Sequence, residues 1–167
     1  MKKSLFFVVA LLVMSFAFNV NAMTWNPFKR EGRVKPHTVI LTGNYIESRL
    51  LAELAQFYTR QPVVLVSKGE GSETEAFYMP NMKEASKITA EEFVDLVNHI
   101  APKRVIVLGN SDYVPASFIE QIRDKYPLIQ IDGTDWSKNA GTLALIIEEK
   151  GLKARFDENM QKINSAE

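Results

Sequence analysis

The 167-residue sequence contains no cysteine and has no excess of either charge. Without cysteine the chain forms no disulfide and carries no lipid-modified cysteine, so the hydrophobic core alone must hold the fold together. Lysine and arginine together number 20, and so do aspartate and glutamate. Binding of nucleic acid requires a concentrated positive surface, which this balance does not provide. We therefore expect no nucleic-acid partner.

Catalytic signatures are also missing. The sequence has no Gly-x-Ser-x-Gly elbow, no His-Glu-x-x-His motif, no Walker loop and no strict metal-ligand spacing. It has only two histidines. His37 is expected at the entrance of a strand, and His99 late on a helix, where an imidazole suits the negative end of the helix dipole better than it serves as a base. We expect no catalytic residue, cofactor or metal, and a binding module rather than an enzyme.

The longest predominantly apolar run, from Leu5 to Phe18, is shorter than the roughly 20 residues that a membrane-spanning helix needs. A lysine pair precedes this run, and a Val-Asn-Ala end with small residues follows it. These features predict a signal peptide over residues 1–22 with cleavage after Ala22, and an uncleaved anchor is the alternative. Cleavage predicts an exported protein, either periplasmic or at the cell surface or secreted, with no transmembrane anchor.

The remaining chain has the length of one domain. Removal of residues 1–22 from the 167 leaves 145, with 18 basic and 20 acidic side chains and a net charge of −2. A chain of that length buries roughly two-thirds of its unfolded surface. Residues 23–36 lack periodicity and are predicted to form a leader arm or linker. We expect an α/β domain over 37–151 and a charged helical tail over 152–167.

Nearly the same six residues occur twice, as Val-Ile-Leu-Thr-Gly-Asn at 39–44 and Val-Ile-Val-Leu-Gly-Asn at 105–110. A β-branched run that ends in glycine is typical of a strand buried on both faces. A helix-like stretch follows each run, which indicates two strand-to-helix switches of one α/β sheet. Because ligands of open α/β sheets bind beyond the carboxyl ends of the strands, this repeat predicts the working edge of the molecule.

The other patterns predict alternating strands and helices in a three-layer open sheet of mainly parallel strands, flavodoxin- or Toprim-like, with four to five strands flanked by helices. Thr89 and Glu92 have the spacing of a capping box at a helix start. Gly151 is expected to end the last helix of the domain. Residues 67–86 are expected to be irregular, apart from one helical turn within 73–79. The remaining expected elements are a helix at 45–60, a strand at 63–66, strands Arg104–Leu108 and Leu128–Ile131, and helices that begin near Pro115 and Trp136.

This order of elements resembles the cell wall-binding repeat 2 family of bacterial surface proteins. That family combines a strand ending in glycine, a helix beginning near Asp-Ala-Leu, a second apolar strand, a Lys-x-Val-x-x-Leu/Ile-Gly-Gly strand and a Gly-x-Asp-Arg-Tyr-x-Thr-Ala segment. The corresponding segments are 43–52, 62–66, 103–110 and 133–140, and the resemblance covers 37–147.

The match to this family is one of pattern. Glu47-Ser48-Arg49 replaces Asp-Ala-Leu, Asn110 replaces the second glycine, and Trp136 replaces the arginine. The resemblance implies contact with a cell-envelope polymer, which the family usually makes with three tandem copies rather than one. A second resemblance, carried by segments 48–50, 64–67 and 72–79, is to SanA-like envelope proteins of unknown biochemical activity. Both imply an exported α/β domain.

Polar and aromatic side chains follow the predicted strand ends. Their oxygens suit either a hard cation such as Mg²⁺ or Ca²⁺, or sugar hydroxyls, or ordinary turns and helix caps. An aromatic ring at such a turn either stacks on a sugar or covers the sheet edge. The predicted ligand-binding residues are Asn44, Tyr45, Glu47, Asn110, Asp112, Tyr113, Asp135 and Trp136.

The function expected from these features is that of an exported, non-enzymatic module that binds an envelope polysaccharide or anionic polymer through its strand-end loops. One alternative is a metal-assisted envelope hydrolase or transferase that uses the aspartates and glutamates of the same edge. Another is an interaction or scaffold protein that uses the charged tail. A single weak site gains avidity only when copies are linked or oligomerised, so a homo-oligomer is one expected arrangement.

Overall fold

The computed structural model describes residues 36–68, 74–80 and 84–166, with Lys68 described in its backbone only. The predicted signal peptide and all of the leader arm except Pro36 lie outside the described residues. Within the described ranges, no helix combines the length and the apolar character needed to cross a membrane.

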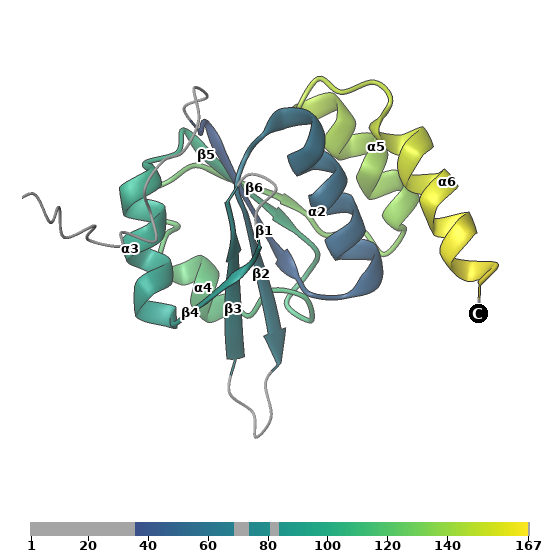
Figure 1. The fold of residues 1–167 in the computed structure, drawn as a ribbon. Coiled ribbons are helices and arrows are strands. Elements are labelled where there is room, and N and C mark those ends of the chain that lie inside the picture. Colours follow the sequence, from purple (N-terminus) through teal and green to yellow (C-terminus); the bar gives the residue numbers. More distant parts are fainter. Residues whose placement is uncertain (1–35, 69–73, 81–83, 167) are drawn as a thin grey trace, which may run out of the picture. The chain divides into compact units, whose positions relative to one another are not determined.

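Six strands form one sheet in the order β4-β3-β2-β1-β5-β6 (Figure 1). Neighbouring strands pair in parallel throughout the block β2-β1-β5-β6. From β1 the chain moves outward to β2 and later returns to the other side of β1, so its direction across the sheet reverses between β1 and β5. The four parallel strands are β1 (Thr38–Gly43), β2 (Val63–Lys68), β5 (Arg104–Leu108) and β6 (Leu128–Ile131).

Two further strands, β3 (Thr74–Met79) and β4 (Ser86–Ile88), extend the sheet beyond β2 as antiparallel neighbours. The predicted count of four to five strands and the predicted helical turn within 73–79 are therefore wrong. The segment Thr-Glu-Ala-Phe-Tyr-Met contains good helix formers and no β-branched run, so its local preference favours a helix. Antiparallel pairing with β2 on one side and β4 on the other holds this segment in a strand.

Helices cover both faces of the sheet and complete the predicted three layers (Figure 1). One face carries α2 (Ile46–Thr59), α5 (Trp136–Ile146) and α6 (Leu152–Asn164). On the other face lie α3 (Ala90–Ile100) and α4 (Ala116–Glu120), whose side chains Phe93 and Phe118 meet edge to face at 5.1 Å between ring centroids.

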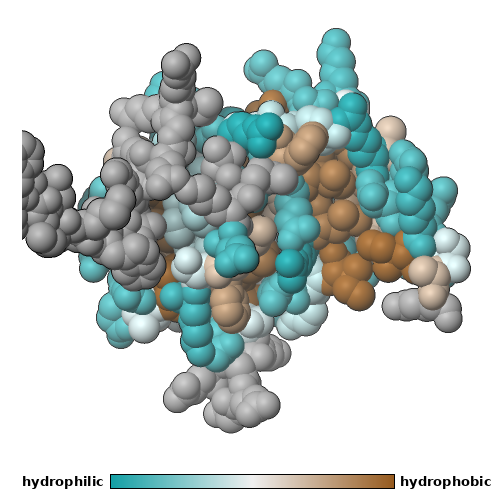
Figure 2. Space-filling view, viewed as in Figure 1, coloured by the Kyte–Doolittle hydropathy of each residue, from teal (hydrophilic) through white to brown (hydrophobic). Residues whose placement is uncertain are grey.

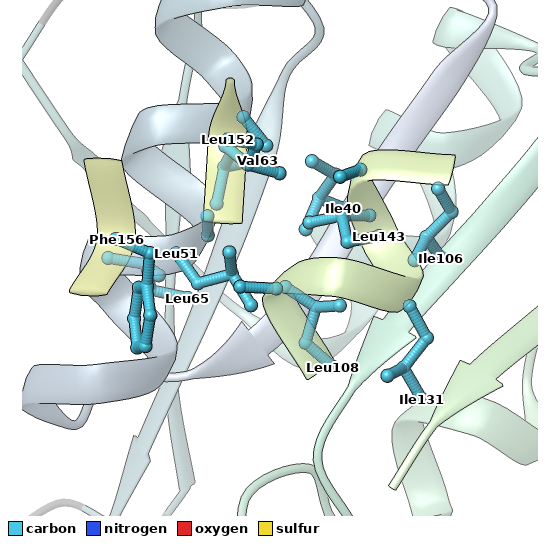
Figure 3. Close-up of a cluster of buried hydrophobic side chains, with 14 of the residues drawn as sticks. Ile40, Leu51, Val63, Leu65, Ile106, Leu108, Ile131, Leu143, Leu152 and Phe156 are labelled. Carbon is cyan, nitrogen blue, oxygen red and sulfur yellow. The ribbon is translucent and has the colours of Figure 1, made fainter. Parts of the chain in front are cut away.

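The two copies of the apolar repeat, in β1 and β5, are buried on both faces of the sheet. Ile40 packs into the core under α2, α5 and α6, whereas its fully buried neighbours Val39 and Leu41 point to the opposite face because side chains alternate along a strand. The prediction of doubly buried strands is thus confirmed. Figure 3 labels the first of these cores as Ile40, Leu51, Val63, Leu65, Ile106, Leu108, Ile131, Leu143, Leu152 and Phe156.

The C-terminal segment predicted as a charged helical tail forms α6, which contacts α5 and α2. Leu152 and Phe156 are buried in the core, so one side of α6 is part of the domain's interior. Apolar side chains reach the surface between α2 and α6, with charged side chains around them (Figure 2). Leu152 and Phe156 of this helix therefore serve packing within the molecule.

Two helix ends test the predicted local signals. Thr89 caps α3 in a capping box with Glu92, as the spacing predicts. The prediction that Gly151 ends α5 is wrong, because α5 ends at Ile146 and Glu148 adopts the left-handed conformation with φ 60°. Gly151 has φ −85° and begins α6 instead. The chain turns early here because Leu152 must enter the core.

Candidate functional site

The candidate site lies where the direction of the chain across the sheet reverses. The register pairs Thr42 of β1 with Leu108 of β5, so Gly43 and Gly109 end adjacent strands. The amide that follows Gly43 still hydrogen-bonds to the sheet, since Asn44 N donates to the Val66 carbonyl at 2.7 Å. Crevices at such reversal points, beyond the carboxyl ends of the strands, are where open α/β sheets bind ligands.

Both glycines of the repeat are required by aromatic residues that pack over the strand ends. Gly109 has φ +98°, a backbone conformation that favours glycine, and a Cβ there would lie 2.6 Å from Cβ of Tyr113. A Cβ on Gly43 would lie 2.8 Å from the ring of Tyr45 and 2.9 Å from the carbonyl oxygen of Tyr113. The repeat therefore brings two tyrosines close to the backbone of β1 and β5.

Tyr45, Tyr113 and Trp136 form an aromatic row at this edge. The ring centroids of Tyr45 and Tyr113 are 5.1 Å apart, and those of Tyr113 and Trp136 are 5.0 Å apart, both edge to face. Trp136 Nε1 donates a hydrogen bond to the Tyr113 hydroxyl at 3.2 Å. Tyr45 is the most open member, with 43% of its surface exposed. The structure thus brings together the three aromatic residues that the sequence placed after separate strands.

A shallow hollow open to solvent lies beside this row. It is far too small to enclose a small molecule, which takes a pocket of roughly 300–1,000 Å³. The surface of the hollow is almost entirely apolar. The lining residues are Tyr45, Val66, Ser67, Thr74, Asp112, Tyr113 and Pro115. Such a surface is suited to contact with part of an extended ligand.

Sequence reasoning missed Ser67 and Thr74. Thr74 reaches the site because β3 runs back along β2, with Thr74 opposite Lys68 and Glu75 opposite Ser67. The residues Thr-Glu-Ala-Phe-Tyr-Met show no alternation of polar and apolar side chains, so the sequence lacks the period-2 signal that would have revealed this strand.

Two of the predicted residues have turn and cap roles. The Asn110 side-chain oxygen accepts a hydrogen bond from Asp112 N at 2.9 Å and so shapes the loop after β5. Asp135 caps α5 by accepting from Lys138 N at 3.1 Å, and this backbone hydrogen bond is the main reason that the pKa of Asp135 is lowered. These contacts support the interpretation of ordinary turns and caps at both positions.

The other predicted positions lie at the same edge. Asn44 is exposed directly after β1, and Glu47 is half-buried in the first turn of α2. Asp112 is exposed, and the Tyr45 hydroxyl lies 3.5 Å from its carbonyl oxygen, a long hydrogen bond. All the predicted residues therefore lie in the strand-end loops or in the first turns of the helices that follow them.

In the described part of the chain, no three His, Asp or Glu side chains are grouped so that they could hold a metal ion. The hydrolase or transferase alternative therefore has no ligand set among these residues. Comparisons with models of protein families, with curated proteins and with solved structures find no match. The resemblances to cell wall-binding repeat 2 and to SanA-like proteins rest on residue patterns alone.

Proposed function

We propose that this α/β domain is a non-catalytic module that binds a polysaccharide of the cell envelope at the aromatic row. The observation that carries the proposal is the contact of Tyr45, Tyr113 and Trp136 at the reversal point of the sheet. Aromatic rings offer a flat apolar surface for the C–H faces of sugars, and polar groups beside them fix orientation.

Residues around the hollow carry such polar groups. Ser67, Thr74 and Asp112 are among its lining residues, and their hydroxyl and carboxylate groups are able to bond sugar hydroxyls. The small volume and open shape favour a surface that grips a few units of a polymer over a cavity that closes on a whole substrate. Several weak contacts then replace a single deep pocket.

Export and the cell wall-binding repeat 2 relationship belong to this proposal. Residues 1–22 have the pattern of a signal peptide, and the pattern over 37–147 resembles one divergent repeat. One copy of a weak site gains avidity when several copies act on one polymer, so we propose oligomers or clustered copies on the envelope.

The test is co-sedimentation of protein, purified from cells that express the full sequence, with isolated envelope sacculi. Tyr45→Ala removes the most exposed ring of the row, and we expect it to weaken binding by about twofold to tenfold. Phe57→Ala is the matched control, because Phe57 is an aromatic residue at the other end of α2 with 47% exposure, close to the 43% of Tyr45.

Tyr45 is a better probe than Asn110 or Trp136, since Asn110 shapes a loop and Trp136 packs partly against the core. Both variants must show the same thermal midpoint as the wild type. Loss of sedimentation in Tyr45→Ala alone supports the proposal. Equal sedimentation of the two variants, or no binding by the wild type, overturns it.

A further inference from the structure

We infer that the proposed polysaccharide site selects sugar units that are uncharged or carry amino groups, and that it rejects polymers with repeated phosphate or carboxylate groups. This inference rests on the proposed function and narrows its ligand class. It is carried by the acidic side chains of this edge that have no ion-pair partner among the described residues, and by the hydrogen bond that the Tyr113 hydroxyl accepts.

Three acids at this edge have no ion-pair partner among the described side chains. Some carboxylates elsewhere do pair with cations, as Glu53 does with Arg49 at 2.7 Å and Asp157 with Lys153 at 2.6 Å. Among the described acids of the site, Asp135 has such a partner, Lys138 at 3.4 Å. No described cationic side chain forms an ion pair with the remaining acids of the edge, Glu47, Asp112 and Asp132.

At this edge, the described part of the chain thus offers three carboxylates without an ion-pair partner. Asp112 lines the hollow directly, where a bound polymer would lie. At about 7 Å in water, repulsion between one phosphate and one carboxylate weakens binding about threefold, and a polyanion meets several such pairs. Salt screens this repulsion, so discrimination should be strongest at low ionic strength.

The hydrogen-bonding groups favour the same ligand class. Ionised Asp112 only accepts hydrogen bonds, which suits hydroxyl, amide N–H and ammonium groups and does not suit phosphate oxygens. The Tyr113 oxygen already accepts from Trp136 Nε1 at 3.2 Å, so its own proton remains for an acceptor such as an acetamido carbonyl. Trp136 is thereby a positioning residue for Tyr113.

The experiment is calorimetric titration of the full-chain protein at about 20 mM salt, a concentration at which surface charges are weakly screened. Three probes are compared: a hexamer of N-acetylglucosamine, the matching glucosamine hexamer, and a polyglycerol phosphate of similar length. We expect both hexamers to bind and the polyphosphate to bind at least about tenfold more weakly, which is the effect of about two repulsive pairs.

Asp112→Asn should raise the affinity for the polyphosphate about threefold, and Asp124→Asn should leave it unchanged. Asp124 provides a matched control because it is exposed and its substitution removes the same charge. It precedes the amino end of β6, whereas the site lies at the carboxyl ends of the strands. Equal thermal midpoints show that both variants are folded.

The outcomes separate the two proposals. Preferential binding of the polyphosphate, or an Asp112→Asn variant that discriminates like the wild type, overturns the inference and leaves polysaccharide binding intact. Sedimentation with sacculi but no binding of either hexamer also overturns the inference. No binding of the hexamers, the polyphosphate or the sacculi overturns the proposed function itself.

Discussion

Gly109 connects the backbone of β5 to the chemistry of the site. Its positive φ is unfavourable for residues with a Cβ, and the ring of Tyr113 occupies the space that a Cβ would need. The same ring contacts both Tyr45 and Trp136. Adding a Cβ at Gly109 is therefore expected to destabilise the end of β5 and to displace the aromatic row.

We expect Gly109→Ala to lower the free energy of unfolding by more than about 1 kcal/mol, because alanine is strained at this φ and its Cβ meets Tyr113. Gly141→Ala is the matched control. Gly141 is helical, a Cβ there meets only Lys153 Cδ at 3.6 Å, and the change should stabilise by about 0.5–1 kcal/mol. Urea unfolding at neutral pH measures both values.

Tryptophan fluorescence gives a second measurement of the Gly109→Ala effect, at the aromatic row itself. In a Trp25→Phe background Trp136 is the only tryptophan, because the sequence has two. Its emission should change in Gly109→Ala and remain as in the parent in Gly141→Ala. Equal stability losses in the two variants would contradict the role assigned to the left-handed glycine.

At the scale of elements, the capping box of α3 shows how a local signal determines a helix start. The Thr89 hydroxyl accepts from Glu92 N at 3.2 Å, and the Glu92 carboxylate accepts from Thr89 N at 2.8 Å. These two residues, only three positions apart, thus satisfy backbone N–H groups that have no partner within the helix. Nothing distant in the sequence is needed.

Thr89→Ala should lower the free energy of unfolding by about 1 kcal/mol, the usual cost of losing an N-cap side chain. Thr142→Ala makes the same chemical change at an exposed position within α5, where the effect should stay within about 0.5 kcal/mol. Chemical denaturation followed by far-ultraviolet circular dichroism compares them. An equal effect of the two substitutions would show that the capping box contributes nothing.

The ion pair of α6 predicts a dependence of stability on pH. Hydrogen bonds from Lys153 and then Ser137 lower the pKa of Asp157 below its ordinary value of 3.8. A carboxyl whose pKa is lower in the folded state stabilises the fold above pH 3.8, and this contribution is lost as the pH falls through the folded pKa. Asp157→Asn should therefore destabilise at neutral pH, by less than about 1 kcal/mol because the pair is partly exposed.

Unfolding midpoints of wild type and Asp157→Asn, measured from pH 7 down to about 2, should converge as the Asp157 carboxyl is protonated. Asp124→Asn serves as the control, since Asp124 is exposed and forms no ion pair with a described side chain. A constant difference between wild type and Asp157→Asn at every pH would contradict the assigned electrostatic role.

At the scale of the whole molecule, α6 closes the core that α2 and α5 begin. Leu152 and Phe156 are almost fully buried beside Leu51 and Leu143, although the rest of α6 is highly charged (Figure 3). A helix with few apolar residues is stabilised by the burial of those few. The C-terminal segment is consequently required for the stability of the domain.

Leu152→Ala should lower the free energy of unfolding by about 2–5 kcal/mol, because it leaves a cavity in a closed core. Leu145→Ala is the same substitution at a residue with 82% exposure, and it should change stability by less than about 0.5 kcal/mol. Thermal unfolding reports both. If Leu152→Ala were as mild as Leu145→Ala, α6 would not belong to the core.

Several elements could be predicted from the sequence because their signals are local. The strand Arg104–Leu108 and the strand Leu128–Ile131 have the predicted bounds, and α2 and α3 begin within a residue of the predicted positions. The strand β3 could not be predicted in this way, since its residues favour a helix and only β2 and β4 hold it extended. Ser67 and Thr74 were missed with it.

By itself, the sequence determined the alternation of buried strands and amphipathic helices, the glycines that end β1 and β5, and the cap of α3, because periodicity and capping act over a few residues. The tertiary structure alone decided that Tyr45, Tyr113 and Trp136 touch and that Thr74 joins them. Those contacts depend on strand order and register, which bring together residues far apart in the chain. A local sequence pattern does not specify which strands become neighbours.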